Sequence, residues 1–222
     1  MSRSGIGVLS PHLDDAALSC YSVLSRDEQV TVINVFAGLP DPDLQPQWFD
    51  RLTGADSPRA RSLERLEEDA AVLERLNCAR VNLPFLEDQY RRRVQDVKPV
   101  AAALIEALGD TRTVYAPAGI GGHPDHVATK AAALHLLGRG ISLTLYAELP
   151  YAHDFGWPHW LTGEDPDPFV DPALHWEAPL VAAGASARDA TIEELSPEAR
   201  RLKLELIRGY RTQFPVLDRR SG

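Results

Sequence analysis

The sequence predicts an α/β fold, with one mostly parallel sheet and helices on both of its faces. Two observations lead to this prediction. Short, continuous runs of Val, Ile and Leu alternate with longer segments of helical periodicity, which is the order of parallel β-α units. In addition, a chain of 222 residues with 44% hydrophobic side chains suits one domain with its own core, which we expect to span residues 1–222.

Five apolar runs predict the strands of this sheet. They cover residues 5–10, 30–37, 79–83, 113–118 and 142–149. Their apolar residues are continuous rather than alternating with polar ones, which is typical of strands that are covered on both faces.

Helical segments are expected between these strands and at the end of the chain. They cover residues 14–25, 59–76, 98–108, 125–137 and 197–211. In the second of them, leucines and one alanine recur at steps of three or four, which predicts a single apolar stripe along the helix. The stripe consists of Leu63, Leu66, Ala70, Leu73 and Leu76.

Two long segments interrupt the alternation. Residues 38–58 are rich in Pro, Asp and Gly, and residues 150–172 hold five prolines and several aromatic side chains. Loops of this length in a compact domain are usually lids or binding loops, so we expect a substrate loop region within residues 150–190. The aromatic side chains of residues 151–160 would stack on a sugar ring, pack the loop itself, or form an oligomer contact.

Composition excludes several classes of protein. Acidic residues outnumber basic ones by 32 to 23, so bulk charge does not predict a nucleic-acid partner. No window approaches the ~20 apolar residues of a membrane span, and the first residues lack the apolar segment of a signal peptide. The two cysteines, Cys20 and Cys78, lie in apolar contexts that are typical of buried thiols in a reducing cytosol. We therefore expect a cytoplasmic protein, with oligomerisation left open.

Two clusters of polar residues follow the first and the fourth predicted strands, at residues 10–15 and 121–126. The carboxyl ends of parallel strands share one edge of the sheet, where ligands bind, so the clusters are expected to meet. His12, Asp15 and His126 form a ligand set that suits Zn²⁺ or Fe²⁺. Asp14 would then be a general base beside the metal, and His123 would protonate a leaving amine or hold an oxyanion. With a metal that acidifies water, this set predicts hydrolysis of an amide or ester.

Each cluster also has a simpler interpretation. An Asp-Asp pair at the start of a helix is often an N-cap with a favourable charge, and the second cluster could be a turn with an Asp cap. A dinucleotide site would need a Gly-x-Gly-x-x-Gly turn after the first strand, where this chain has residues 11–15 with two carboxylates. We therefore reject the dinucleotide site.

The two clusters resemble the signature motifs of the PIG-L family, also called LmbE-like, in the stretches Pro-His-Leu-Asp-Asp (11–15) and His-Pro-Asp-His (123–126). Weaker similarities are Arg65-x-x-Glu68 and the stretch from Lys203 to Gln213. The resemblance implies a Rossmann-like fold and a metal-dependent N-deacetylase of N-acetylglucosamine-type substrates.

The resemblance also implies a role for each matching residue. The implied metal ligands are His12, Asp15 and His126. Asp14 would be the general base, His123 the general acid or oxyanion partner, and Asp125 a residue that orients His123 through a hydrogen bond. Arg65 matches a position that contacts sugar hydroxyls in some members, although an ion pair on the helix surface is the alternative.

This chain departs from the family pattern at three positions. Leu13 and Ala16 replace the Pro and Glu of the more common first motif, which leaves the ligands in place but removes one carboxylate. Gly121 stands where some members have a Tyr. The oxyanion would then be held either by His123 and the metal alone or by a Tyr from elsewhere in the chain.

Charged residues after the third strand could shape the substrate pocket. Asp88 could bind a sugar hydroxyl or be a solvated loop residue. The run of three arginines at 91–93 is typical of a solvated face, with a grip on a phosphate or carboxylate of the substrate as the alternative.

The sequence therefore predicts a zinc-dependent hydrolase, with Fe²⁺ as the other metal considered, that removes an acyl group from an N-acetylglucosamine-type sugar or its conjugate. A thiol-conjugate amidase and a tailoring deacetylase of a natural product are alternatives with the same chemistry. A non-catalytic metal- or sugar-binding module is an alternative of a different class, and it would not need Asp14 beside a complete set of ligands.

Overall fold

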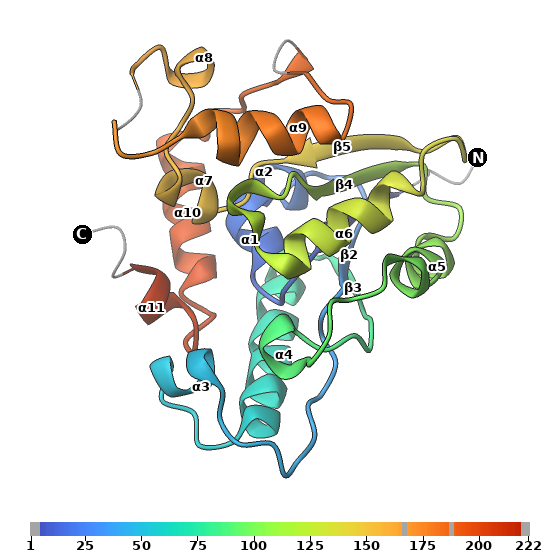
Figure 1. Cartoon of the computed structure of the whole chain (residues 1–222), viewed down its shortest axis with the longest axis vertical. Coiled ribbons are helices and arrows are strands. Elements are labelled where there is room, and N and C mark those ends of the chain that lie inside the picture. The colour runs from blue at the N-terminus through green and yellow to red at the C-terminus, as the bar shows by residue number, and fades with distance from the viewer. Residues whose placement is uncertain (1–4, 166–167, 187–188, 219–222) are drawn as a thin grey trace.

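A five-stranded sheet forms the centre of the protein in the computed structural model, which describes residues 5–165, 168–186 and 189–218 (Figure 1). All four pairs of neighbouring strands are parallel, in the order β3-β2-β1-β4-β5. The predicted α/β fold with a parallel sheet is confirmed. The strands are β1 (Ile6–Ser10), β2 (Val30–Asn34), β3 (Ala79–Asn82), β4 (Thr113–Pro117) and β5 (Ser142–Tyr146).

The strand order places a switch point beside β1. The chain proceeds outward from β1 to β3, then returns to the other side of β1 to form β4 and β5. Ile6 consequently pairs with Val30 of β2 on one side and with Thr113 of β4 on the other. Loops that follow β1 and β4 diverge to opposite faces there, which opens the crevice where α/β proteins bind ligands.

Helices cover both faces of the sheet (Figure 1). Successive strand residues point to opposite faces, so Val8 packs in one apolar cluster and Leu9 in the other. The helices on the Val8 side are α1 (Asp15–Ser19), α2 (Tyr21–Leu24), α4 (Pro58–Arg75) and α10 (Pro197–Ile207). Those on the Leu9 side are α5 (Val97–Leu108) and α6 (Pro124–Leu134).

Three of the longer helices begin in the same way, with a capping side chain followed by proline. Ser57 and Ser196 accept a hydrogen bond from a backbone N–H of the first turn of α4 and α10, and His123 does the same for α6. Proline suits the next position because its missing N–H would have no partner in the helix. The start of α6, which carries the second motif, is therefore set by local sequence.

Some boundaries differ from the prediction. The helix predicted at 14–25 is divided into α1 and α2 at Cys20, whose backbone is not helical. The strand predicted to end at residue 37 ends at Asn34, because Phe36 forms an antiparallel bridge with Pro84 instead of continuing the parallel ladder. The strand predicted to reach residue 149 ends at Tyr146, and the helix predicted at 197–211 ends at Ile207.

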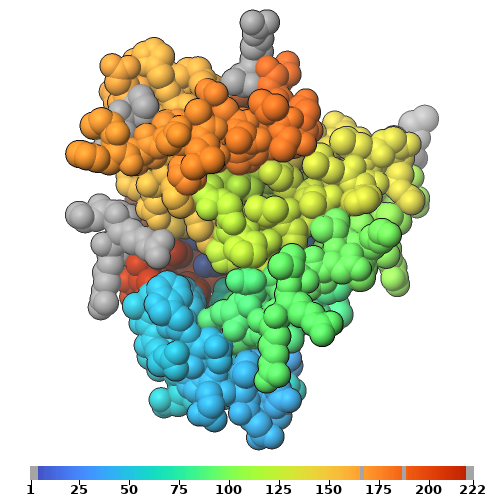
Figure 2. All heavy atoms as spheres, in the orientation of Figure 1, coloured from blue at the N-terminus to red at the C-terminus, as the bar shows by residue number. Residues whose placement is uncertain are grey.

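The long segments predicted as loops contain short helices. They are α3 (Trp48–Leu52), α7 (Tyr151–Asp154), α8 (His159–Thr162), the π-helical turn η3 (Ala173–Glu177) and α9 (Ala178–Ala182). The segment after β5 packs on the loop after β4 through a third apolar cluster, which includes Ile120, Ala152 and Trp176. Figure 2 shows a hollow on this face between the orange segment after β5 and the blue segment before α4.

The remaining helices are the turn η1 (Asp88–Tyr90), the turn η2 (Ile120–Gly122) and α11 (Phe214–Asp218). In the described part of the chain, no helix is long and apolar enough to cross a membrane.

Candidate active site

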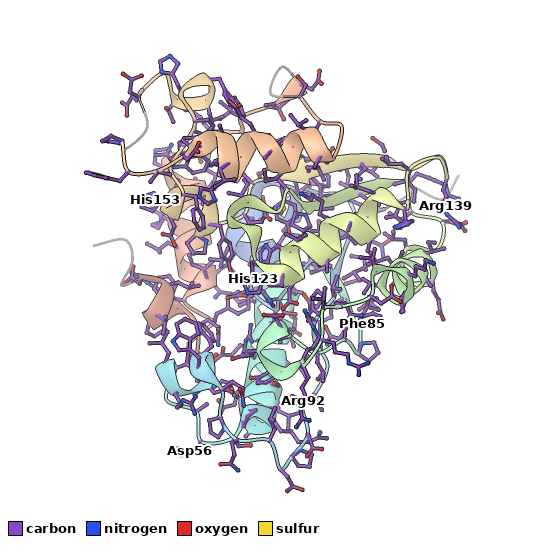
Figure 3. The ribbon with its side chains drawn as sticks, viewed as in Figure 1. Asp56, Phe85, Arg92, His123, Arg139 and His153 are labelled. Carbon is purple, nitrogen blue, oxygen red and sulfur yellow. The ribbon has the colours of Figure 1, made fainter. Side chains whose placement is uncertain are left out.

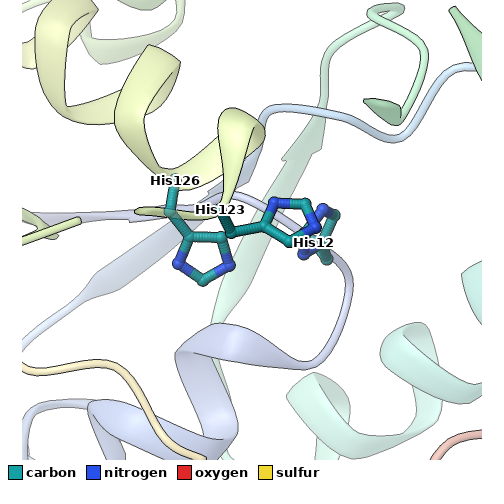
Figure 4. A group of neighbouring side chains, drawn as sticks. All are labelled: His12, His123 and His126. Atoms are coloured by element: carbon teal, nitrogen blue, oxygen red, sulfur yellow. The ribbon is translucent and has the colours of Figure 1, made fainter. Parts of the chain in front are cut away.

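Three histidines from the two motifs meet at the switch point (Figure 4). His12 follows β1, His123 caps α6, and His126 lies in the first turn of α6. The ring centroid of His12 lies 5.0 Å from that of His123 and 5.2 Å from that of His126, and His123 lies 5.3 Å from His126. The expected meeting of the two motifs is thus observed, near the middle of the molecule (Figure 3).

Asp15 completes a set of donor atoms with two of these histidines. Its Oδ2 lies 3.2 Å from Nδ1 of His12 and 3.2 Å from Nε2 of His126. Two ligands of a tetrahedral zinc ion, at bonds of ~2.0–2.2 Å, stand roughly 3.3–3.6 Å apart, so these spacings fit one shared ion. Moreover, Nε2 of His126 is a buried nitrogen without a hydrogen-bond partner among the described residues. A cation would satisfy that nitrogen.

A buried carboxylate holds each of these two imidazoles from behind. Asp125 Oδ2 lies 2.9 Å from Nε2 of His12, and Glu148 Oε1 lies 3.2 Å from Nδ1 of His126. In each ring the nitrogen that faces away from Asp15 is thereby bound, and the other nitrogen is left for a metal. Carboxylates behind metal-binding histidines commonly fix the orientation of the ring in this way.

The contacts of Asp125 correct one expectation. Asp125 was expected to orient His123 through a hydrogen bond from its carboxylate. The structure instead directs that carboxylate to His12, and residue 125 binds His123 through its backbone N–H, which donates to Nδ1 at 3.2 Å. The reason is geometric, because Asp125 lies in the first turn of α6 and points back across the gap to the loop after β1.

Glu148 was missed by the sequence analysis, which placed it inside the fifth strand. It is fully buried, and its two oxygens accept hydrogen bonds from three consecutive backbone N–H groups after β4 as well as from His126. These groups belong to Ala118, Gly119 and Ile120. An acidic residue just past a strand on the ligand-binding edge was the signal that could have indicated it.

Electrostatics around the site favour a cation. Burial disfavours a charged imidazole, but the hydrogen bonds that the ring donates to Asp125 and Asp15 outweigh it and raise the pKa of His12 well above its usual range. The pKa of His126 is about 9, because the nearby Asp15 and Glu148 outweigh its burial. Conversely, burial opposes ionisation of Asp15, yet the two histidines hold its pKa well below normal.

His123 is in a different state from the other two histidines. Burial, together with the positive charge on His12 and His126, lowers its pKa to about 3. Its Nδ1 accepts the Asp125 N–H, so the neutral ring carries its hydrogen on Nε2. His123 therefore presents an N–H donor, although one of its nitrogens also lies within 4.8 Å of a ligand atom of His12 and of His126.

Asp14 is buried but does not act as an N-cap. It precedes α1, yet its side chain makes no capping hydrogen bond, which removes the simpler interpretation of the Asp-Asp pair for this residue. Burial and the neighbouring Asp15 raise its pKa, against the opposing charges of Arg65 and His12. Its carboxylate is thus available for proton transfer.

Arg65 is not on the helix surface. It is only 4% exposed, its Nη1 pairs with Glu87, and its Nη2 lies 3.9 Å from Oδ1 of Asp14. The alternative of a surface ion pair is therefore wrong, and the buried Arg65 side chain lies beside Asp14. Asp88 lies in η1 with its side chain about half exposed, and its backbone N–H donates to Asp125.

The run of three arginines is split by the fold. Arg92 and Arg93 are exposed, as expected of a solvated face, but Arg91 points inward and pairs with Asp125 at 2.6 Å. The expectation of a solvated run is therefore wrong for Arg91.

The segment after β5 contributes aromatic rings beside the histidines. The ring of Tyr151 lies 4.9 Å from His126 and 5.9 Å from His123, between centroids. A tyrosine from elsewhere in the chain thus flanks His123. Gly121 itself faces Phe155, since a Cβ at Gly121 would lie 2.3 Å from that ring.

Comparisons with known proteins agree with this geometry. The chain matches the family of GlcNAc-PI de-N-acetylases, PIG-L, over residues 8–137. It is 31% identical to the 2'-N-acetylparomamine deacetylase of Streptomyces fradiae in an alignment of 169 residues that covers 65% of this chain and 57% of that protein. This match spans less than two thirds of the relative's length.

Solved structures of two deacetylases are also similar. The A40926 pseudoaglycone deacetylase Dbv21 is 29% identical, with a TM-score of 0.69, covering 98% of this chain and 85% of its own. The zinc-inhibited form of the teicoplanin deacetylase Orf2 is 27% identical, with a TM-score of 0.73, covering 96% of this chain and 86% of its own.

The family match extends over more than half of the chain and includes both of the motifs that converge at the switch point. The resemblance noted in the sequence is therefore confirmed: this protein is a member of the PIG-L family.

Proposed function

We propose that this protein is a divalent-metal-dependent hydrolase that removes an acyl group, most simply acetyl, from the amine of an N-acetylglucosamine-type unit in a glycoconjugate. The observation that carries the proposal is the position of Asp15 Oδ2, 3.2 Å from a nitrogen of both His12 and His126, beside a buried Asp14 with no capping role. The similar deacetylases of paromamine, teicoplanin and A40926 derivatives support a sugar amide as substrate.

The proposed metal ligands are His12, Asp15 and His126. Two imidazoles and one carboxylate suit Zn²⁺ and Fe²⁺ alike, and the zinc-inhibited form of Orf2 makes the activating metal a question to test. When bound, a divalent ion supplies a Lewis acid that polarises the amide carbonyl and lowers the pKa of water. His123 is left out of this set because its Nδ1 is taken by a backbone N–H, so that Nε2 bears the hydrogen.

Asp14 and His123 then have separate roles, proton transfer for Asp14 and stabilisation of the oxyanion for His123. The Asp14 carboxylate accepts a proton from the water that attacks the amide carbon. His123 Nε2–H donates a hydrogen bond to the carbonyl oxygen as negative charge develops on it. When the C–N bond breaks, the proton passes from Asp14 to the leaving amine, and acetate departs. His123 as the proton donor is the alternative, which its low pKa disfavours.

The substrate contacts proposed are Asp88 and Arg65. Asp88 has a half-exposed carboxylate at the active edge, so it can accept a hydrogen bond from a sugar hydroxyl. Arg65 lies between Asp14 and Glu87, and a hydroxyl placed next to Asp14 would come within its reach. A reducing, cytoplasmic location is also part of the proposal, which the two free cysteines support.

The test is a measurement of acetate release from a panel of N-acetyl amino sugars and their conjugates. Protein freed of metal is reloaded with Zn²⁺, Fe²⁺ or Co²⁺ in separate samples. We expect release with at least one metal and none with the metal-free protein. Metal binding without acetate release from any member of the panel would contradict the proposed activity and favour a binding module.

A further inference from the structure

Arg91 is a partly buried arginine that lies behind the candidate metal site. Its side chain is 9% exposed, and its guanidinium lies 4.9 Å from the centre of the Phe36 ring. Nη1 donates to the carbonyl oxygen of Leu86 at 2.5 Å and to Asp125 Oδ1 at 2.6 Å. An arginine with this much of its hydrogen-bonding capacity used inside the protein is not part of a solvated face.

The carboxylate of Asp125 depends on this arginine. Asp125 is fully buried, and its Oδ2 is occupied by Nε2 of His12 and the backbone N–H of Asp88, both at 2.9 Å. Arg91 binds the other oxygen and brings a permanent positive charge. Since a buried carboxylate without a charged partner is costly, loss of Arg91 should loosen Asp125 and with it the orientation of His12.

Arg91 also contacts the proposed substrate side. Its Nη2 lies 3.3 Å from Oδ1 of Asp88, whose side chain is about half exposed. One guanidinium therefore touches a carboxylate at the surface of the site and another behind a metal-site histidine. A lysine could not do the same, because its ammonium is a single point charge without the planar fork of an arginine.

We propose that Arg91 is a positioning residue of this site. Its guanidinium holds Asp88 and Asp125 in one mutual arrangement, so that Nδ1 of His12 stays directed at Asp15 while Asp88 keeps its place at the surface. The role given to Asp88 in this inference rests on the proposed function. The effect of Arg91 on metal affinity does not depend on the proposed function. Arg91 acts through its two carboxylate partners and has no contact of its own with the reacting atoms.

The test compares Arg91→Ala and Arg91→Lys with Arg92→Ala, which removes an exposed arginine from the same run. Zinc affinity is measured by competition with a chromogenic chelator, and kcat and KM are measured by acetate release. We expect zinc affinity to fall by about 10- to 100-fold in Arg91→Ala and by less in Arg91→Lys. Arg92→Ala should bind zinc as the wild type does. Added guanidinium ion should restore part of the lost affinity in Arg91→Ala.

Several results would overturn the proposal. They are wild-type zinc affinity in Arg91→Ala or Arg91→Lys, an equal loss in Arg92→Ala, or a loss in Arg91→Ala that guanidinium ion does not reduce. If Arg91→Ala does not fold, as judged by circular dichroism, Arg91→Lys decides the question alone. A wild-type protein that binds zinc but releases no acetate would contradict the proposed function and leave this affinity comparison intact.

Discussion

Asp14 and Asp15 are adjacent in the sequence, but their surroundings give them different chemistry. Asp15 lies between two histidines that hold its pKa well below normal, whereas burial and Asp15 itself raise the pKa of Asp14. Two carboxylates whose pKa values are pushed apart in this way commonly divide the roles of a permanently charged group and a proton carrier.

Asp14→Asn is therefore expected to keep the metal and lose activity. The amide cannot accept a proton from water, so acetate release should fall by about 100-fold or more, while metal content per chain stays at the wild-type level. The measurements are kcat and metal analysis of the same sample. Asp110→Asn, at an exposed position, is the control, and an Asp14→Asn variant with full activity would refute the role of the base.

Glu148 offers a second prediction at the scale of single residues. Both of its oxygens accept N–H hydrogen bonds, from Gly119 and His126 on Oε1 and from Ala118 and Ile120 on Oε2. In Glu148→Gln, an amide NH₂ must face at least one of these donors, so the His126 ring loses its fixed orientation. We expect zinc affinity to fall by about 10- to 100-fold in a chelator competition. Glu106→Gln, on an exposed part of α5, should bind zinc normally, and an unchanged Glu148→Gln would rule out this role.

At the scale of elements, the turn η2 and the segment after β5 are held together by a close approach at Gly121. Gly121 has a φ of +75° and faces the Phe155 ring at a distance that excludes a Cβ. Gly138 has a similar φ of +83° but open space around it. The two glycines therefore separate the cost of backbone conformation from the cost of the contact.

Gly121→Ala should destabilise the protein by more than Gly138→Ala does. Both variants carry the cost of a positive φ, on the order of 1 kcal/mol, and only Gly121→Ala also displaces Phe155. The free energy of unfolding, measured with denaturant, checks the difference. In the double variant Gly121→Ala/Phe155→Ala the loss specific to Gly121 should shrink, and equal losses in the two single variants would contradict the contact.

A second link between elements connects β2, α4 and the segment that follows α10 through Asp69. Its carboxylate accepts hydrogen bonds from Asn34 at 2.7 Å and from the hydroxyl of Tyr210 at 3.0 Å. Burial nevertheless raises the pKa of Asp69 to about 7, because it outweighs these two hydrogen bonds. The folded protein thus holds this proton more tightly than the unfolded chain, in which the pKa is about 3.9.

The sign of the pH dependence follows from that raised pKa. Below about pH 4 Asp69 is protonated in both the folded and the unfolded protein, so it does not lower the free energy of unfolding. As the pH rises through 7, it lowers that free energy by an increasing amount. Relative to Asp69→Asn, the wild type should lose up to about 4 kcal/mol of unfolding free energy between pH 4 and pH 8. Denaturant unfolding of both proteins at a series of pH values measures this difference, and a difference independent of pH would show that Asp69 stays ionised.

At the scale of the whole molecule, a shared ion would join the two halves of the sheet. His12 follows β1, and His126 belongs to the crossover between β4 and β5, so the metal site bridges the switch point. A ligand that binds only the folded state raises its stability according to its concentration and affinity.

Zinc at about 100 times its Kd should stabilise the protein by about 2.7 kcal/mol and raise Tm by roughly 5–10 °C. His126→Ala should abolish the rise, and His135→Ala, which changes an exposed histidine, should keep it. Calorimetry with and without zinc measures the shift within each variant, so a lower starting stability of His126→Ala does not affect the comparison. The same rise in His126→Ala would place the metal elsewhere.

The types of element and the two motifs could be predicted from the order of residues along the chain. Continuous Val and Ile runs, helical stripes, and serine or histidine caps before proline are local signals, so strands, helices and the start of α6 follow from neighbouring residues. The convergence of residues 10–15 and 121–126 was also predictable, because parallel strands place their carboxyl ends at one edge.

The charged side chains that support that site could not be predicted in this way, because the folded chain brings them together. Arg91 and Arg92 are adjacent and identical in type, yet one points inward and pairs with Asp125 and the other is exposed. Similarly, Asp125 binds His12 rather than His123, and Glu148 reaches His126 from the end of β5. The physical reason is that a buried carboxylate takes whichever donors the strand order brings within about 3 Å, and these lie far away in the sequence.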